Sequence, residues 1–413
     1  MSTSAVSTAE AVAERALGAL VGAKVEDGSA VGWPAWALTD PSIPARMAVD
    51  DVTLYNGDAG IAWALAGLGQ ALDRRELTAL AGRAATRVLG NPDALSGGGL
   101  LAGRAGGALA AYSIGLPGGA MSSPRRPMTC DLTDGAAGVL LAQVRTGAAP
   151  DHDLVRALAR RASAQEVGWA WADAPTESSA GEGSAGEGSA GDGDRGAPAP
   201  LLGLAHGASG VALALVESAA VAPEMRPALA LAAGGLAWES GWFDPLQGWP
   251  DLRGDESTFP VWWCHGAAGM TAVRLRLLEL AEQGVDLGMP LSSLRAQAHA
   301  GLELCTDHVE AAVVAAGAGE LPSAGLTLCH GLGGALDALG YASQVTGDEA
   351  HRLLAADALG RVAGVMGEDP MQWPSGTREA GSSSLFLGLA GVAMIAARLA
   401  WPDAGVPCPS LLR

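Results

Sequence analysis

Seven short segments that are apolar on nearly every side recur along the chain. Residues 211–215 and 392–396 are two of them, and a helix that is apolar all round is buried, so the segments predict seven inner helices. Each segment follows a Gly-x-x-Gly phrase, and these phrases recur about every 55 residues, as expected of two-helix units. The two glycines of the successive phrases are Gly57 and Gly60, Gly103 and Gly106, Gly135 and Gly138, Gly207 and Gly210, Gly266 and Gly269, Gly331 and Gly334, and Gly388 and Gly391.

Longer amphipathic stretches lie between the phrases and predict outer helices that cover the inner ones. They run from Glu76 to Leu89, Asp153 to Glu166, Leu291 to Ala316 and Glu349 to Met366, and residues 1–20 have a similar character. Inner and outer helices closed in a ring give an all-α fold, an α/α toroid of seven repeats. We expect about fourteen main helices in one domain, residues 1–413, with every phrase at the N-terminus of an inner helix on one rim.

The two glycines of each phrase have different expected tasks. We expect the first to adopt a positive φ in the turn into the inner helix, and the second to let crowded inner helices approach closely. Residues one and two places before the first glycine then lie at helix N-termini around one mouth of the ring. Negative charge is favoured there, which suits thiolates and carboxylates.

Two irregular stretches interrupt the repeats. Residues 175–200 repeat Ser-Ala-Gly-Glu-Gly with minor changes, which predicts a disordered loop inserted within the domain. Residues 242–263 carry four of the twelve tryptophans, which predicts a structured loop over the mouth. Those tryptophans either pack the loop against the ring or contact a substrate.

The composition excludes several classes of function. The net charge of −19 argues against a nucleic-acid partner, whose phosphates would be repelled. Five scattered cysteines form no disulfide framework, which favours a reducing, cytoplasmic location. No apolar run approaches the roughly 18 residues of a membrane span, and the N-terminus lacks the apolar core of a signal peptide.

Candidate chemistry is concentrated at the positions just before the first glycine. Cys264 and Cys329 lie two places before it, where chance would put about 0.1 cysteine in the seven slots, and His206, His265 and His330 lie one place before it. Cysteine and histidine are zinc ligands, and Cys264, Cys329 and His330 with an open fourth position would make a catalytic site. Two alternatives are a pair of small buried cysteines and a closed structural site with His265 as fourth ligand.

These phrases resemble motifs of the lanthionine synthetase C family, the LanC-type and LanC-like cyclases. Residues 263–269, Trp-Cys-His-Gly-Ala-Ala-Gly, are similar to the family motif Trp-Cys-(Tyr/His)-Gly-x-Pro-Gly, and residues 328–334 contain its Cys-His-Gly motif. Residues 131–138 and 203–210 are similar to two further motifs. The resemblance covers all seven repeats and implies a seven-repeat α/α barrel with one zinc ion.

The resemblance also implies roles for individual residues. Cys264, Cys329 and His330 would bind Zn²⁺, and His206 and Asp131 would be the acid–base pair. Asp134 competes with Asp131 for its role because it lies directly before Gly135, and Asp131 could instead cap a helix.

Two departures from the family pattern concern the surroundings of the site. His265 stands where one branch of the family carries tyrosine, and Pro260 where that branch carries an arginine. His265 and Arg253 are candidates to surround the metal ligands, and Arg253 could replace the missing arginine.

The implied reaction is the addition of peptide cysteine thiolates to dehydroalanine or dehydrobutyrine, with His206 protonating the resulting enolate. The substrate would be a dehydrated precursor peptide, and the chain has no room for a dehydratase, so a separate dehydrating enzyme is expected as partner. The alternatives are addition of glutathione-type thiols to dehydrated proteins and a non-catalytic, peptide-binding scaffold in a biosynthetic complex.

Overall fold

The computed structural model describes residues 2–36, 47–48, 51–95, 97–116, 129–172, 199–254, 257–377 and 380–413. Thirteen α-helices occur in these residues. The inner set is α2 (Asp58–Ala71), α4 (Arg104–Ser113), α5 (Ala136–Arg145), α7 (Ala208–Val221), α9 (Ala267–Glu282), α11 (Gly333–Thr346) and α13 (Leu389–Ala400). The outer set is α1 (Ser2–Gly22), α3 (Arg75–Gly90), α6 (His152–Arg161), α8 (Ala228–Ser240), α10 (Leu291–Gly317) and α12 (Glu349–Met366).

The strands are short and form three antiparallel pairs. They are β1 (Val25–Asp27) with β2 (Ala30–Gly32), β3 (Ala35–Trp36) with β4 (Met47–Ala48), and β5 (Ser163–Ala164) with β6 (Trp169–Ala170). The helices therefore carry the architecture. Within the part of the chain that the structure describes, no helix has both the length and the apolar character needed to cross a membrane.

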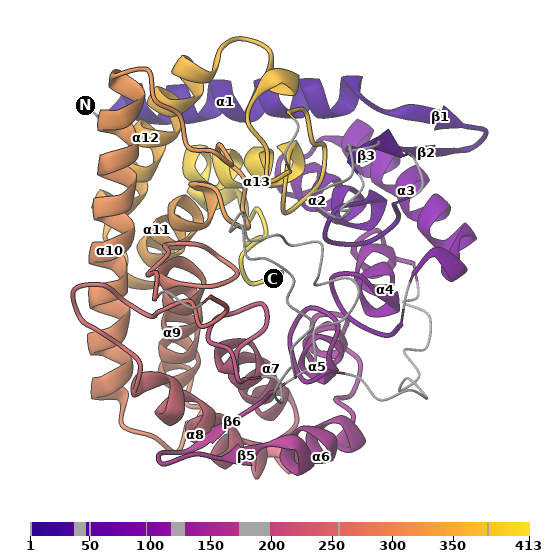
Figure 1. Cartoon of the computed structure of the whole chain (residues 1–413). Coiled ribbons are helices and arrows are strands. Elements are labelled where there is room, and N and C mark those ends of the chain that lie inside the picture. The colour runs from indigo at the N-terminus through magenta and orange to yellow at the C-terminus, as the bar shows by residue number, and fades with distance from the viewer. Residues whose placement is uncertain are drawn as a thin grey trace, which may run out of the picture.

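The helices form a double ring (Figure 1). The seven inner helices surround the centre of the molecule, and the outer helices lie around them. Six of the inner helices begin directly after the first glycine of a phrase, and α11 begins two residues after Gly331. The inner helices are buried on nearly all sides, which explains their lack of a polar face.

A belt of backbone hydrogen bonds closes the inner ring. It links residues two places before the first glycine, except that in the third repeat Thr133 accepts and its neighbour Leu132 donates, and the N···O distances lie between 2.8 and 3.3 Å. The N–H groups of Tyr55, Leu101, Leu132, Ala205, Cys264, Cys329 and Phe386 donate in turn to the carbonyl groups of Leu101, Thr133, Ala205, Cys264, Cys329, Phe386 and Tyr55. The belt returns to its starting residue, so all seven phrases lie on one rim and the predicted α/α toroid is confirmed.

The second glycine of each phrase permits this closure. A Cβ atom on Gly60 would lie 2.1 Å from the Leu54 carbonyl oxygen and 2.8 Å from the Cβ atom of Leu385, in the last repeat. The corresponding glycines meet the preceding repeat in the same way; on Gly106 the Cβ would lie 2.8 Å from that of Leu54. Close approach between repeats therefore requires glycine, as expected.

The prediction that the first glycine adopts a positive φ is wrong for most repeats. Gly57 has a φ of −118° and Gly135 of −102°, values open to any residue, and only Gly266, at +128°, is in the expected region among the first glycines. The physical reason for glycine is again contact. A Cβ atom on Gly135 would lie 2.4 Å from the Asp131 backbone nitrogen.

The predicted outer helices occur, with one correction. The stretch from Asp153 to Glu166 is helical only to Arg161, because Ser163 and Ala164 pair with β6 and the Trp171 indole donates to the Leu158 carbonyl. Helix α8 was not predicted, since it is rich in alanine and has little amphipathic pattern. Between α4 and α5, where a seventh outer helix would be needed, residues 117–128 lie outside the described residues, and so do residues 175–198 of the predicted disordered loop.

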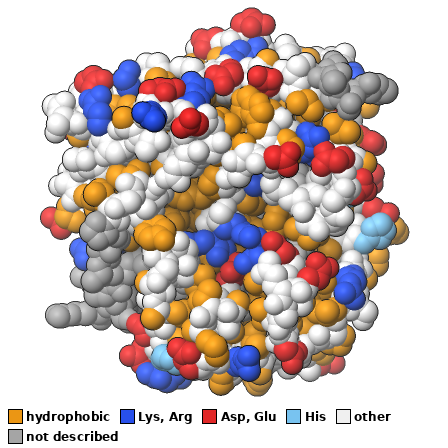
Figure 2. Space-filling view, turned by 180° about the vertical axis from the view of Figure 1, so that it is seen from behind, with side chains coloured by type: hydrophobic (Ala, Val, Ile, Leu, Met, Phe, Trp, Pro, Cys, Tyr) orange, Lys and Arg blue, Asp and Glu red, His pale blue; other side chains and the backbone are white. Residues whose placement is uncertain are grey.

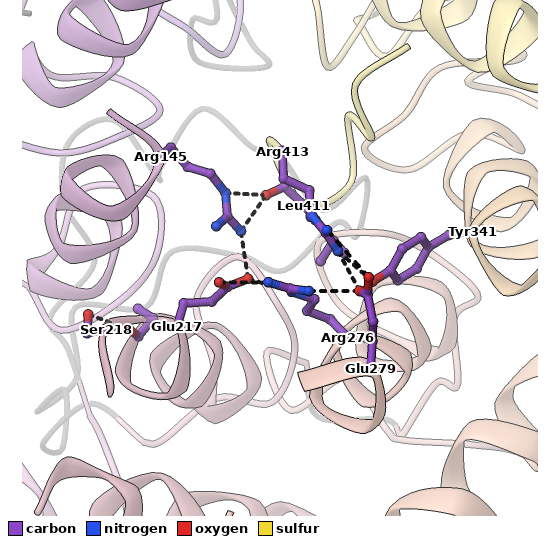
Figure 3. A network of polar contacts seen from close by, with 9 residues as sticks. Arg145, Glu217, Ser218, Arg276, Glu279, Tyr341, Leu411 and Arg413 are labelled. Atoms are coloured by element: carbon purple, nitrogen blue, oxygen red, sulfur yellow. Dashed lines mark hydrogen bonds and ion pairs between the residues drawn. The ribbon is translucent and has the colours of Figure 1, made fainter. Parts of the chain in front are cut away.

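The C-terminal segment fills the middle of the ring (Figure 1). Leu411 and Leu412 are buried, and the Trp263 indole donates to the Ser410 carbonyl at 2.9 Å. Figure 3 shows how Arg145 of α5 also donates to the Leu411 carbonyl, at 3.2 Å. The segment therefore joins the rim that carries the phrases to the inner faces of several helices.

A network of arginine and glutamate side chains surrounds this segment (Figure 3). Glu217 of α7 lies between Arg145, at 3.0 Å, and Arg276 of α9, at 2.7 Å. Burial opposes the ionisation of Glu217, but the two guanidinium groups outweigh it and lower the pKa of Glu217 to about 2. On the face seen from behind, basic side chains gather in a hollow at the middle of the molecule (Figure 2).

Candidate metal centre

Three of the predicted residues come together on the rim. The ligand atoms of Cys264, Cys329 and His330 all lie within 4.8 Å of one another. Among the described residues, this is the one set of three or more cysteine, histidine or carboxylate side chains that could hold a metal ion. Both cysteines are buried and His330 is partly exposed.

The belt explains why residues 65 positions apart in sequence meet. Cys264 and Cys329 are neighbours in it, since the Cys264 N–H donates to the Cys329 carbonyl at 3.3 Å. The turn after Cys264 needs Gly266, because a Cβ atom there would lie 2.0 Å from the Pro260 carbonyl oxygen and the φ is +128°. Register within the repeat therefore places both thiols side by side.

His330 has the orientation typical of a metal ligand. Its Nε2 lies 2.9 Å from the carbonyl oxygen of Gly376, which accepts a hydrogen bond from the imidazole. This bond assigns the proton to Nε2 and makes Nδ1 the nitrogen that would bind a metal. The Trp262 ring packs edge-on against His330, with ring centroids 6.2 Å apart.

His206 and Asp131 form a second pair on the same rim. His206 Nδ1 lies 2.7 Å from Asp131 Oδ2, and both side chains are about nine-tenths buried. The other carboxylate oxygen of Asp131 accepts hydrogen bonds from the Asp134 N–H and the Thr129 hydroxyl, each at 3.0 Å. Asp131 thus both caps the turn and contacts His206. Of Asp131 and Asp134, it is the Asp131 carboxylate that bonds to His206 in the structure.

His265 lies beside His206 and is not part of the cysteine–histidine set. The two imidazole rings stack with centroids 5.6 Å apart, and His265 Nδ1 donates to the Leu202 carbonyl at 3.0 Å. Burial lowers the pKa of His265 to about 3, and the charges of Arg253 and His206 act in the same direction. His265 is therefore neutral, and it does not join the three candidate ligands.

Arg253 approaches this group from the tryptophan-rich loop. Its guanidinium binds Asp251, with Nη2···Oδ2 at 2.7 Å, and its side chain is about a quarter exposed. Within the same loop, Trp249 is fully buried against Phe243 and the Arg274 guanidinium. Packing therefore accounts for Trp249, whereas Trp262 faces the site.

A buried ion pair that contacts the turn carrying His206 was not predicted from the sequence. Glu239 of α8 and Arg274 of α9 are completely buried, with Oε2···Nη2 at 2.7 Å. Glu239 Oε1 also accepts from the backbone N–H groups of Gly203, at 3.3 Å, and Ser209, at 3.2 Å. The pair thus anchors both ends of the turn that carries His206.

Tyr55 is a further neighbour of the candidate ligands that was not predicted from the sequence. Its hydroxyl lies 3.2 Å from the Cys329 sulfur. A signal was available, because Tyr55 occupies the same slot in the first repeat as the two cysteines do in theirs.

Comparisons with known proteins agree with this architecture. A family model described as lanthionine synthetase C-like protein matches residues 182–412. Among solved structures, nisin cyclase is similar, with a TM-score of 0.57 and 12% sequence identity over 88% of this chain and 92% of that chain. At this identity the likeness shows a shared fold. A search of curated protein sequences gives no match.

Proposed function

Since this chain belongs to the lanthionine synthetase C-like family, we propose that it is a zinc-dependent cyclase that forms thioether rings in a dehydrated peptide. One observation carries the proposal: the Cys264–Cys329–His330 set and the His206–Asp131 pair lie on one rim of one ring. The first provides a site for a thiophilic metal, and the second provides a proton donor.

The residues present fit zinc. Two sulfurs and one imidazole nitrogen are the donor types that Zn²⁺ prefers, and three protein ligands leave a position for a substrate. The Gly376 carbonyl fixes the His330 ring as the carbonyl partners of zinc-bound histidines do. Zinc bound there would favour the thiolate form of a substrate cysteine.

His206 is placed to manage the proton. Its Nδ1–H donates to Asp131, so Nε2 is the atom that carries the transferred proton. When a thiolate adds to the β-carbon of dehydroalanine or dehydrobutyrine, the electron pair moves to the α-carbon and its carbonyl, and His206 Nε2–H delivers a proton to the α-carbon. The Asp131 carboxylate orients the ring and stabilises its positive charge before transfer.

The neutral His265 ring lies beside His206, the proposed proton donor. With Nδ1 donating to the Leu202 carbonyl, its Nε2 is a buried acceptor that lies without a hydrogen-bond partner among the described residues. We place it, with Arg253, among the groups that surround His206 and the candidate metal ligands. Arg253 then supplies a cation near the mouth in place of the arginine missing at Pro260.

The substrate we favour is a precursor peptide with cysteine and dehydrated serine or threonine residues, made by a separate dehydrating enzyme in the cytoplasm. None of the five cysteines, all of which the structure describes, forms a disulfide, in keeping with a reducing compartment. Addition of glutathione-type thiols to dehydrated proteins is a second candidate function. It is favoured by the histidine at position 265, since the LanC-like members resemble this chain at that position.

The test is conversion of a synthetic peptide that contains one dehydroalanine and one cysteine. Cyclisation leaves the mass unchanged, so remaining thiols are alkylated and the products weighed. We expect the zinc-loaded protein to protect the thiol, and His206→Asn to keep its zinc while turnover falls by about 10²–10⁴-fold. The matched control is His299→Asn, at an exposed position on α10, which should retain full activity.

Three outcomes would count against the proposal in different ways. If the wild-type protein shows no activity with zinc, the scaffold function is favoured. Addition of glutathione to a dehydrated peptide that lacks cysteine, at a higher rate than cyclisation, would favour the second candidate. Loss of zinc in His206→Asn would move His206 into the ligand set.

A further inference from the structure

Tyr55 is buried beside one of the candidate metal ligands. Its side chain comes from the turn before α2, far in sequence from Cys329, and its hydroxyl oxygen lies 3.2 Å from the Cys329 sulfur. Only 5% of Tyr55 is exposed, so water does not compete for this contact. The distance is that of a hydrogen bond from the hydroxyl to sulfur.

The position of the hydroxyl is determined by the backbone and by packing. Cys329, Phe386 and Tyr55 are consecutive in the hydrogen-bond belt, so the tyrosine reaches past one neighbour to the sulfur. Its ring stacks on that of Phe386, with centroids 5.2 Å apart and planes 17° apart. Trp263 packs on Phe386 in turn, at 4.7 Å. The tyrosine ring therefore has little freedom to turn its hydroxyl elsewhere.

A hydrogen bond at this place matters most when the sulfur is negatively charged. A cysteine that binds a metal does so as a thiolate, and the sulfur of Cys329 is nearly inaccessible to water. A hydroxyl donor replaces part of the lost hydration, and hydrogen bonds to charged acceptors are the stronger ones. The partners of metal ligands also orient them and tune the metal, at a cost of about 10–100-fold in affinity when they are removed.

We propose that Tyr55 is a positioning residue of the metal site, whose hydroxyl donates to the Cys329 sulfur, holds it toward the metal and stabilises its negative charge. This inference rests on the proposed metal site. It assigns to the first repeat, which supplies none of the three candidate ligands, a part in metal binding that acts through Cys329.

The test is Tyr55→Phe, which keeps the stacked ring and removes only the hydroxyl. Zinc affinity is measured by competition with a chromophoric chelator, and the protein is also loaded with Co²⁺ to record the sulfur-to-cobalt charge-transfer band. We expect zinc binding to weaken by about 10–100-fold. The band should move to longer wavelength, because a sulfur without its hydrogen bond gives up an electron more easily.

Tyr341→Phe is the matched control. Tyr341 is equally buried on α11 and donates to Glu279, 2.5 Å away, in the arginine–glutamate network around the C-terminal segment. Its replacement should change neither zinc affinity nor the cobalt band. The band separates positioning from a general structural role, since a loss of stability alone would not shift it.

The outcomes also separate this inference from the proposed function. If Tyr55→Phe binds zinc as tightly as the wild type and shows the same cobalt band, the positioning role is refuted while the metal site stands. If the wild-type protein binds neither zinc nor cobalt, both fail. A weakened affinity and shifted band in Tyr55→Phe, with Tyr341→Phe unchanged, supports both.

Discussion

The buried pair of Glu239 and Arg274 offers a quantitative test of how the turn that carries His206 is held. The pair has no exposed surface, and Glu239 accepts from the backbone N–H groups of Gly203 and Ser209 on either side of His206. Glu239→Gln keeps an oxygen for the two backbone groups but removes the charge. It therefore leaves the Arg274 guanidinium buried beside a neutral amide.

The expected loss follows from the burial of both partners. Breaking a buried ion pair by removing one partner costs about 3–5 kcal/mol of unfolding free energy, because the remaining charge is uncompensated. For a chain of 413 residues this corresponds to a fall of about 3–6 °C in the thermal midpoint. The double variant Glu239→Gln with Arg274→Met removes both charges, so it should cost about 2–3 kcal/mol less than the two single changes added together.

The assay is urea unfolding of the parent, the two single variants and the double variant, with zinc content and cyclisation measured on each. Asp357→Asn is the control, because it breaks an exposed pair with Arg361 on α12 and should cost less than about 1 kcal/mol. None of the candidate metal ligands lies in the supported turn, so zinc should be retained while cyclisation slows. Purely additive costs, or a loss from Glu239→Gln as small as the control's, would refute the reasoning.

Three further changes test the ring, the network around the C-terminal segment and the proposed role of the His206–Asp131 pair. Gly60→Ala should destabilise the fold by about 1–3 kcal/mol, because its methyl group would overlap the Leu54 carbonyl. Gly82→Ala, which has open space around it on α3, should be neutral or stabilising. The midpoints of urea unfolding check both variants, and equal midpoints would contradict the role of Gly60 in closing the ring. The pKa of Glu217 is about 2 in the folded protein and 4.5 in the unfolded chain, so this group should cost the parent about 3 kcal/mol of unfolding free energy as the pH falls from 5 toward 2. Glu217→Gln should be less stable than the parent at pH 7 but should lose less unfolding free energy in an acid titration. Parallel curves of stability against pH for the two proteins would argue against the low pKa. Asp131→Asn should keep zinc and lower the cyclisation rate by about 10²–10⁴-fold, measured with the dehydrated peptide, and an unchanged rate would remove Asp131 from the pair.

The sequence by itself determined the ring and the meeting of the candidate ligands. Seven all-apolar segments after seven Gly-x-x-Gly phrases predict buried inner helices, and the same slot in each repeat predicts that Cys264 and Cys329 lie on one rim. Both inferences use only periodicity. Each repeat packs on the next in the same register, so a position within the phrase specifies a position on the ring.

Other features depended on contacts between different repeats, and only the tertiary structure decided them. In the sequence Asp134 competed with Asp131, which only the family resemblance favoured, but it is Asp131 whose carboxylate lies 2.7 Å from His206, 75 residues away. The Gly376 carbonyl assigns the proton of His330, and Tyr55 reaches the sulfur of Cys329 only because the last repeat closes on the first.

The glycines illustrate the same division. The spacing of the glycines could be read from the sequence, but the reason for the first glycine of most phrases could not. At Gly57 and Gly135, for example, the reason is not a positive φ but backbone atoms that would lie within 2.3–2.6 Å of an added Cβ atom. Helix α8 was likewise not predicted, although it supplies Glu239, which contacts the turn that carries His206. The local pattern of apolar and polar residues specifies which segments are helical and buried. It does not specify the partner of a buried charge, sulfur or imidazole, because that partner is set by the packing of chain segments that are distant in sequence.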